Sequence, residues 1–265
     1  MQREVFSVPA DGVALYCEKR GSGPLLILVP DGSNDCEPYA KVAELLADEF
    51  TVVIFDMRGG TRSMPQEHRK ITPEILAGDV AAIIRYMNLG KASVYGCSSG
   101  GQTVLTLGLH YPELVRNIMV HEAALQNDTP IPGTGFEYFR VLAETFGPKC
   151  VGFTPVEVVF HCNVFQADIL DDACRQRLKA NRAYWERYYL GTVDMDSYTG
   201  EDLAKMPSVE FTVGAWTPSW MSYANIATAE RGSRPYKWLP CAHAPHLSCP
   251  GVLADHIRTT CRKYL

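Results

Sequence analysis

The sequence predicts an α/β fold in which helices flank a mostly parallel β-sheet. Short apolar runs rich in β-branched residues recur along the chain, and amphipathic helical patterns separate them. The length of 265 residues suits one such domain, with or without an insertion. Strands that alternate with helices pair in parallel, because each crossover helix returns the chain to the same end of the sheet.

The strands are expected to begin with an N-terminal hairpin, because residues 5–8 and 13–18 flank the turn-forming pair Asp11-Gly12. Further apolar runs predict strands of the main sheet at residues 25–29, 51–55, 92–96, 117–121, 210–215 and 236–239. Amphipathic patterns predict helices at residues 38–46, 72–87, 101–110 and 250–264.

Residues 125–205 interrupt this alternation. The segment is rich in aromatic residues and has helical patterning without a run of parallel-strand character. We therefore expect a helical cap at 125–205, inserted over the carboxyl edge of the sheet, and a core formed by residues 1–124 and 206–265. The cap would roof an apolar pocket, with Trp185, Trp216 and Trp220 as candidate walls.

Composition excludes several classes of protein. The net charge of −5 argues against a nucleic-acid or anionic-membrane partner, and no apolar run approaches the roughly 18 residues that span a bilayer. The first ten residues lack the apolar core of a signal peptide, and the nine cysteines have no zinc-type spacing. We expect a cytoplasmic monomer or homodimer with reduced thiols, no metal and no cofactor.

The segment Gly96-Cys97-Ser98-Ser99-Gly100 has the pattern G-x-S-x-G. It lies between a predicted strand and a predicted helix, which is the context of the nucleophile elbow of the α/β-hydrolase fold. The sharp turn leaves room only for glycine on either side and exposes the serine. We expect Ser98 to be the nucleophile; the alternative is a glycine-rich turn without chemistry.

A serine needs a base to take its proton, and two histidines lie in the loop after the last predicted strand. In the chain order of this fold the base comes from that loop. We expect His243, which is nearer the strand end, to be the base. His246 is the competitor and otherwise a candidate for substrate contact.

The triad acid is inferred by elimination. No carboxylate follows the predicted strand 210–215 until Glu230, whereas strand 117–121 ends directly in Glu122. That strand should lie between the nucleophile's strand and the penultimate one, so the longer glutamate side chain could reach the imidazole. We expect Glu122 to be the acid; alternatives are a strand-end carboxylate bonded to loop amides, or Asp31 or Glu230 as the acid.

The oxyanion hole should consist of two backbone N–H groups. One belongs to Ser99, the residue after the nucleophile, and the other to the loop after strand 25–29. Gly32 is our choice there, because a glycine lets the substrate approach its amide closely. Asp31, beside it, is a candidate for substrate contact.

Several stretches along the core resemble one family, the fungal zearalenone lactonases, which are α/β-hydrolases that open the ester of a resorcylic acid macrolactone. They are Val29-Pro30-Asp31-Gly32, Phe55-Asp56-Met57, Gly96-Cys97-Ser98-Ser99-Gly100, His121-Glu122, Thr212-Val213-Gly214-Ala215 with Thr217-Pro218, Leu239-Pro240 with His243 and Pro245, and Lys263-Tyr264-Leu265. The resemblance implies a triad of Ser98, Glu122 and His243, in agreement with the elimination above. Trp185 resembles the family's cap tryptophan that packs on the ligand. Around the base, Cys241, Ala242, Ala244 and His246 replace residues of different bulk.

The residues thus predict a serine hydrolase that forms an acyl-enzyme on Ser98. The resemblance implies that its partner is a small-molecule lactone, most specifically a resorcylic acid macrolactone such as zearalenone. Two alternatives stay open. One is a carboxylesterase for another class of substrate. The other is a hormone-receptor-like α/β-hydrolase with slow turnover.

Overall fold

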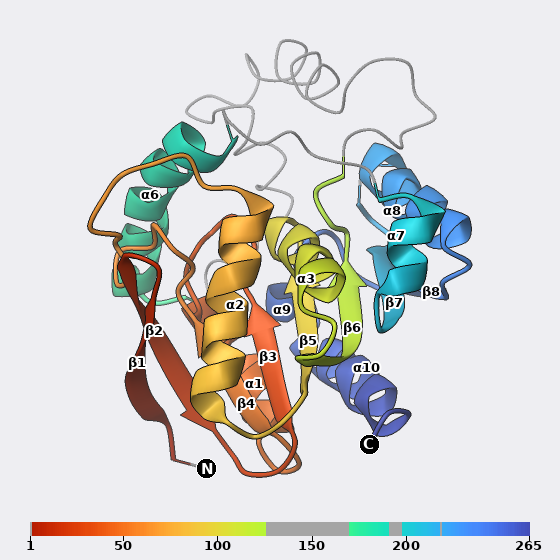
Figure 1. The fold of residues 1–265 in the computed structure, drawn as a ribbon, viewed down its shortest axis with the longest axis horizontal. Helices are drawn as coiled ribbons and strands as arrows, with labels where there is room; N and C mark the ends of the chain where they lie inside the picture. The colour runs from red at the N-terminus through yellow and green to blue at the C-terminus, as the bar shows by residue number, and fades with distance from the viewer. Residues whose placement is uncertain (1, 126–169, 191–197, 218) are drawn as a thin grey trace.

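The computed structural model describes residues 2–125, 170–190, 198–217 and 219–265 (Figure 1). Its centre is an eight-stranded sheet with the strand order β1-β2-β4-β3-β5-β6-β7-β8. The first two strands form the expected antiparallel hairpin, β2 is also antiparallel to β4, and all later pairs are parallel. The strands are β1 (Glu4–Ala10), β2 (Val13–Arg20), β3 (Leu25–Val29), β4 (Thr51–Phe55), β5 (Ala92–Cys97), β6 (Val115–His121), β7 (Ser208–Gly214) and β8 (Tyr236–Leu239).

Helices cover both faces of the sheet. On one face α2, α3, α7 and α8 contribute to one apolar cluster, and on the other α1 and α10 contribute to a second (Figure 1). The described helices are η1 (Glu37–Tyr39), α1 (Ala40–Leu46), α2 (Pro73–Met87), α3 (Ser99–His110), α6 (Asp172–Trp185), the π-helical turn η4 (Glu186–Leu190), α7 (Gly200–Lys205), α8 (Ser219–Arg231), α9 (Pro245–Ser248) and α10 (Pro250–Arg262). None of the helices in these ranges is long and apolar enough to cross a bilayer.

The central strands are apolar throughout because both of their faces are covered. In β3, Leu25, Ile27 and Val29 pack into one cluster, while Leu26 and Leu28 pack into the other. All five residues of β3 are buried. Because β3 packs against both apolar clusters, its carboxyl end, where the loop with Gly32 begins, is held in place.

The described part of the predicted cap lies near the loops that follow β3 and β4. Helix α6 bonds to both loops through Asn181, whose partners are Ser33 and Thr61. Helix α7, which falls within the predicted cap range, packs against α3, and its Leu203 belongs to the core cluster. Residues 126–169 and 191–197 lie outside the described residues, so the extent of a cap at 125–205 stays a prediction.

Candidate active site

Ser98 lies at a strained turn between β5 and α3. Its φ of 56° and ψ of −121° are unusual for any residue with a side chain. A Cβ on Gly96 would lie 2.2 Å from the Gly100 carbonyl oxygen, and one on Gly100 would lie 2.3 Å from the Pro30 carbonyl oxygen. Both glycines of the motif are therefore required by close backbone contacts. The Ser98 side chain makes no capping hydrogen bond to α3.

Glu122 and His243 are brought together beside this turn. β6 pairs with β5 so that Cys97 lies opposite His121, the last residue of each strand, and Ser98 and Glu122 follow directly after them. The Ser98 amide donates to the His121 carbonyl (3.0 Å). Across the site, Glu122 Oε2 lies 2.9 Å from His243 Nδ1, and the Cys97 thiol lies 3.2 Å from the His243 carbonyl oxygen. The sheet register and this thiol contact hold the three residues in one neighbourhood.

The Glu122 carboxylate is fully buried and surrounded by donors. Its Oε1 accepts from the Gly214 amide (2.6 Å) and faces the Ser222 hydroxyl (3.5 Å), and its Oε2 accepts from the Thr217 hydroxyl (3.0 Å). Burial alone would raise the pKa of Glu122, but the neighbouring His121 and the hydrogen bonds from His243 and Gly214 outweigh it and lower the pKa. The carboxylate therefore stays ionised at neutral pH.

Two neighbouring groups are uncharged at neutral pH. Burial lowers the pKa of His121 to about 4 and raises the pKa of the Cys97 thiol well above its ordinary value. The Cys97 sulfur is therefore a protonated packing group rather than a second nucleophile.

The loop after β3 presents the amide of Gly32. Neither this amide nor that of Ser99 donates a backbone hydrogen bond within the part of the chain that the structure describes. The Asp31 side chain turns back to accept from the Ser33 amide (2.9 Å) and lies 3.5 Å from His246 Nε2. His246 is buried and stacks on Tyr39 at 4.0 Å, so the structure places it beside Asp31 rather than beside Glu122.

The three candidate tryptophans lie in different environments. A Cβ on Gly32 would lie 2.9 Å from the Trp185 ring, so the indole covers the candidate oxyanion loop, and it stacks on Tyr189 at 5.4 Å. Trp216 is 71% exposed. Trp220 belongs to α8, and its side chain lies outside the described part of the structure. Trp185 is therefore the aromatic residue that the described structure places at the site.

Comparison with known proteins identifies the fold and the family of this chain. Residues 24–143 match the family model for the alpha/beta hydrolase fold. A zearalenone hydrolase from Cladophialophora bantiana is 34% identical over 96% of this chain and 95% of its own length. The chain belongs to the zearalenone hydrolase family. A second zearalenone hydrolase, from Bionectria ochroleuca, is 31% identical over 99% of both chains. A thermophilic esterase from Thermogutta terrifontis, 22% identical, shares the fold with a TM-score of 0.74 over 100% of this chain and 99% of its own.

The sequence of this member of the zearalenone hydrolase family did not reveal every group at the candidate site. It missed the Gly214 amide and the Thr217 and Ser222 hydroxyls that bind Glu122. Gly214 and Thr217 lie in stretches that carry the family resemblance, but nothing in the sequence assigns these groups to the carboxylate, and only the fold brings them to it. It also missed Asn181, a buried polar residue in a helical pattern.

Among the residues that the structure describes, two groups of side chains offer metal-ligand atoms within 4.8 Å of one another. In the first, Asp31 and His246 meet the Cys97 thiol, which burial keeps protonated. The second is Asp35, Cys36 and Asp56. Its carboxylates already bind guanidinium groups, since Arg62 contacts both aspartates and Arg177 lies 2.6 Å from Asp35. Side-chain cations thus neutralise the second group.

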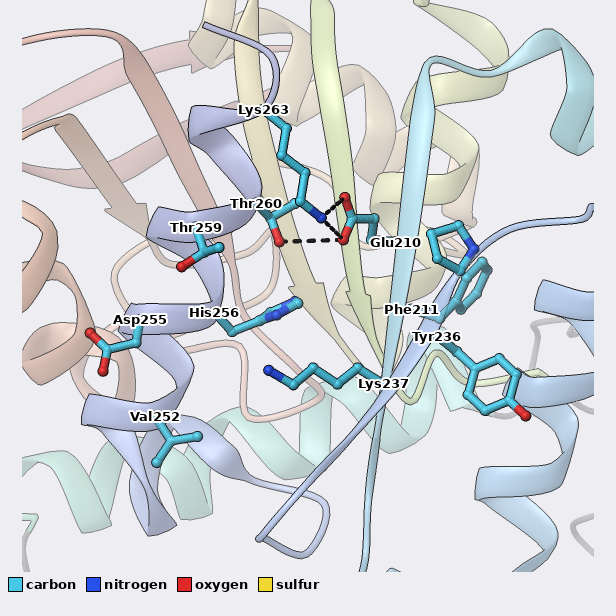
Figure 2. A pocket seen from close by; sticks show the side chains of 11 residues that line it. Glu210, Phe211, Tyr236, Lys237, Val252, Asp255, His256, Thr259, Thr260 and Lys263 are labelled. Carbon is cyan, nitrogen blue, oxygen red and sulfur yellow. Dashed lines mark hydrogen bonds and ion pairs between the residues drawn. The ribbon is translucent and has the colours of Figure 1, made fainter.

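A pocket of about 290 Å³ lies away from these residues, between α10 and the strands β7 and β8 (Figure 2). His256 and Lys237 face it from opposite walls, and on one side Lys263 and Thr260 bond to Glu210. None of the residues that line it is a predicted site residue.

Proposed function

We propose that this chain is a serine hydrolase that opens the ester bond of lactones, in particular resorcylic acid macrolactones such as zearalenone. Family membership supports the broader statement that it hydrolyses esters or lactones. The observation that carries the proposed serine mechanism is the buried Glu122–His243 contact of 2.9 Å beside a serine at a strained strand-to-helix turn.

The first step forms an acyl-enzyme. Ionised Glu122 cannot donate, so His243 Nδ1 carries the proton of their hydrogen bond, and Nε2 on the other side of the ring carries the lone pair. Nε2 takes the proton of the Ser98 hydroxyl while Oγ attacks the ester carbonyl carbon. The resulting oxyanion accepts from the Gly32 and Ser99 amides, and loss of one such donor typically costs about 3 kcal/mol of barrier.

Collapse of this intermediate breaks the bond between the carbonyl carbon and the ring oxygen. The leaving alkoxide takes the proton from His243, the ring opens, and the acid half stays esterified to Ser98. A water molecule then gives a proton to His243 Nε2 and attacks the acyl carbon. Ser98 leaves with that proton, and the open-chain hydroxy acid is released.

Three observations support an aromatic macrolactone as substrate. The Trp185 indole covers the Gly32 loop, where it would stack on an aromatic ring whose ester faces Ser98. Asp31, next to Gly32 in this loop, lies 3.5 Å from His246, and this polar pair could orient substrate hydroxyls. Both full-length relatives carry the name zearalenone hydrolase.

The test is zearalenone hydrolysis, followed by chromatography, for the wild type beside Ser98→Ala. Rapid ring opening by the wild type alone supports the proposal. Activity of the wild type on another lactone or a simple ester, without zearalenone turnover, would retain the serine mechanism and refute the substrate. Tight zearalenone binding without turnover would favour the receptor-like alternative. Equal activity of both proteins would refute Ser98 as the nucleophile.

A further inference from the structure

Asn181 is a buried polar residue of α6 whose amide joins two loops at the carboxyl end of the sheet. Its side chain is 1% exposed. Nδ2 donates to the Ser33 carbonyl (2.9 Å), while Oδ1 accepts from the amide (2.7 Å) and the hydroxyl (2.5 Å) of Thr61. One amide thus connects the loop after β4 with the loop that contains Gly32.

The Ser33 carbonyl is coupled to the Gly32 amide through the backbone. It belongs to the same peptide unit as the Asn34 amide, which donates to the Asp31 carbonyl (3.1 Å). The Asp31 carbonyl in turn belongs to the peptide unit whose N–H is that of Gly32. From Asn181 to Gly32, hydrogen bonds and peptide planes therefore alternate without a break.

This chain also extends beyond Asn181 on the other side. The Thr61 amide shares its peptide unit with the Gly60 carbonyl, which accepts from the Ser63 amide (2.8 Å). Successive amides that donate in the same direction polarise one another, and each bond fixes the plane of the next unit. The last N–H, on Gly32, has no backbone acceptor among the described residues.

We propose that Asn181 is a positioning residue for the oxyanion hole, the central link of a chain of hydrogen-bonded amides that aims and polarises the Gly32 N–H. The inference depends on the proposed function, because it assigns to that N–H the charge that develops during ester hydrolysis. An N–H held in this way before the reaction needs no reorientation when the oxyanion forms.

Two features of the site support a dedicated role over general anchoring of α6. The helix already has an ion pair with the core through Arg177 and Asp35, one turn before Asn181. The Asp31 side chain accepts from the Ser33 amide (2.9 Å), so a hydrogen bond inside the loop already holds the turn at residues 31–33. The bond from Asn181 to the Ser33 carbonyl adds a connection between this turn and α6.

The test compares Asn181→Ala and Asn181→Asp with the controls Thr61→Val and Arg177→Met. Asn181→Asp keeps an acceptor for Thr61 but loses the donor to Ser33. Thr61→Val removes the hydrogen bond from the Thr61 hydroxyl to Asn181 Oδ1 but keeps the bond from the Thr61 amide, so the chain of hydrogen-bonded amides stays intact. Arg177→Met removes the ion pair of α6 alone. Thermal melts followed by circular dichroism establish that each variant is folded.

Complete loss of one oxyanion donor costs about 10²- to 10³-fold in kcat, and a donor that is present but poorly held should cost less. We expect kcat on zearalenone and on p-nitrophenyl acetate to fall about 10- to 100-fold in both Asn181 variants, with KM nearly unchanged. Phenylboronic acid, which forms a tetrahedral adduct on an active serine, should bind more weakly by a similar factor. Both controls should stay within about twofold of wild type.

The outcomes separate this inference from the proposed function. Folded Asn181 variants with wild-type kcat and boronate affinity would overturn the positioning role while Ser98→Ala still abolishes activity. An equal loss in Arg177→Met would show that anchoring of α6 is what matters, and unfolding of both Asn181 variants would make the residue structural. A wild type that neither hydrolyses esters nor binds the boronate would refute the proposed function and this inference together.

Discussion

Substitution of Glu122 by glutamine tests the candidate acid with nearly no change in shape. The Gly214 amide (2.6 Å from Oε1) cannot reverse its hydrogen, so the glutamine oxygen must take the Oε1 position. Its NH₂ group then takes the Oε2 position, 2.9 Å from His243 Nδ1. To accept from that NH₂, Nδ1 must lose its proton, and the ring proton moves to Nε2, the nitrogen that has to accept from Ser98.

This wrong tautomer should lower kcat by about 10⁴-fold, equivalent to about 5 kcal/mol of transition-state stabilisation. Steady-state hydrolysis of zearalenone, or of p-nitrophenyl acetate, measures the loss. Glu230→Gln is the matched control, since Glu230 is exposed on α8, and it should keep wild-type activity. A Glu122→Gln protein within tenfold of wild type would refute the reasoning, and loss of activity in Glu230→Gln or Asp31→Asn instead would reassign the acid.

Three further predictions concern other parts of the molecule. Gly100→Ala should lower the melting temperature sharply or prevent folding, because its Cβ would lie 2.3 Å from the Pro30 carbonyl oxygen. Gly251→Ala, which places its Cβ in open space on α10, should be neutral or stabilising. Thermal melts that show equal effects of the two substitutions would contradict this. Trp185→Ala should raise KM for zearalenone with a smaller effect on p-nitrophenyl acetate, and an unfolded product would indicate a core role instead. Burial lowers the pKa of His256 to about 4, so the unfolded state binds its proton first, and this residue alone should remove up to about 3 kcal/mol of stability as pH falls from about 6.5 to 4. The buried His121 and His246, whose pKa values are also about 4, add to the loss in the wild type. His256→Gln should reduce this dependence of the unfolding free energy without changing kcat, and an unchanged slope would show that another group is responsible.

Much of the fold could be predicted from the sequence because its strands are short apolar runs with clear ends. The predicted strands 25–29, 51–55 and 236–239 agree in their bounds with β3, β4 and β8. Helix α8 was not predicted, since its apolar residues do not form one stripe and its buried face includes Ser222, Asn225 and Thr228. These polar residues are buried because each finds a hydrogen-bond partner: Ser222 and Asn225 donate to residues about 100 positions away, Glu122 and Ala123, and Thr228 donates to the Ala224 carbonyl on its own helix. A periodicity argument does not reveal such partners.

The candidate site was predictable where local sequence carries the geometry. The glycines around Ser98 predict the sharp turn, and the absence of a carboxylate after β7 directs attention to Glu122. The groups that tune the site come from distant parts of the chain. Thr217 reaches Glu122 across 95 residues and Asn181 reaches Ser33 across 148, and only the folded chain brings them together.

Glu122 directly follows β6, whereas other groups that surround its carboxylate come from the turn after β7. Positioning of the candidate acid and contact with solvent or substrate are thus divided between two segments. Ser98 and Glu122 follow residues that pair directly across neighbouring strands, so their spacing is set by the hydrogen-bonded register of the sheet. The turn after β7 then contributes a backbone amide and a hydroxyl to the carboxylate, while its Trp216 points largely to solvent. The exposed side chains of that turn can therefore change without displacing Glu122, as long as the bonds from Gly214 and Thr217 are kept. Under the proposed function, such changes would alter substrate contacts while the sheet keeps Glu122 in register with Ser98.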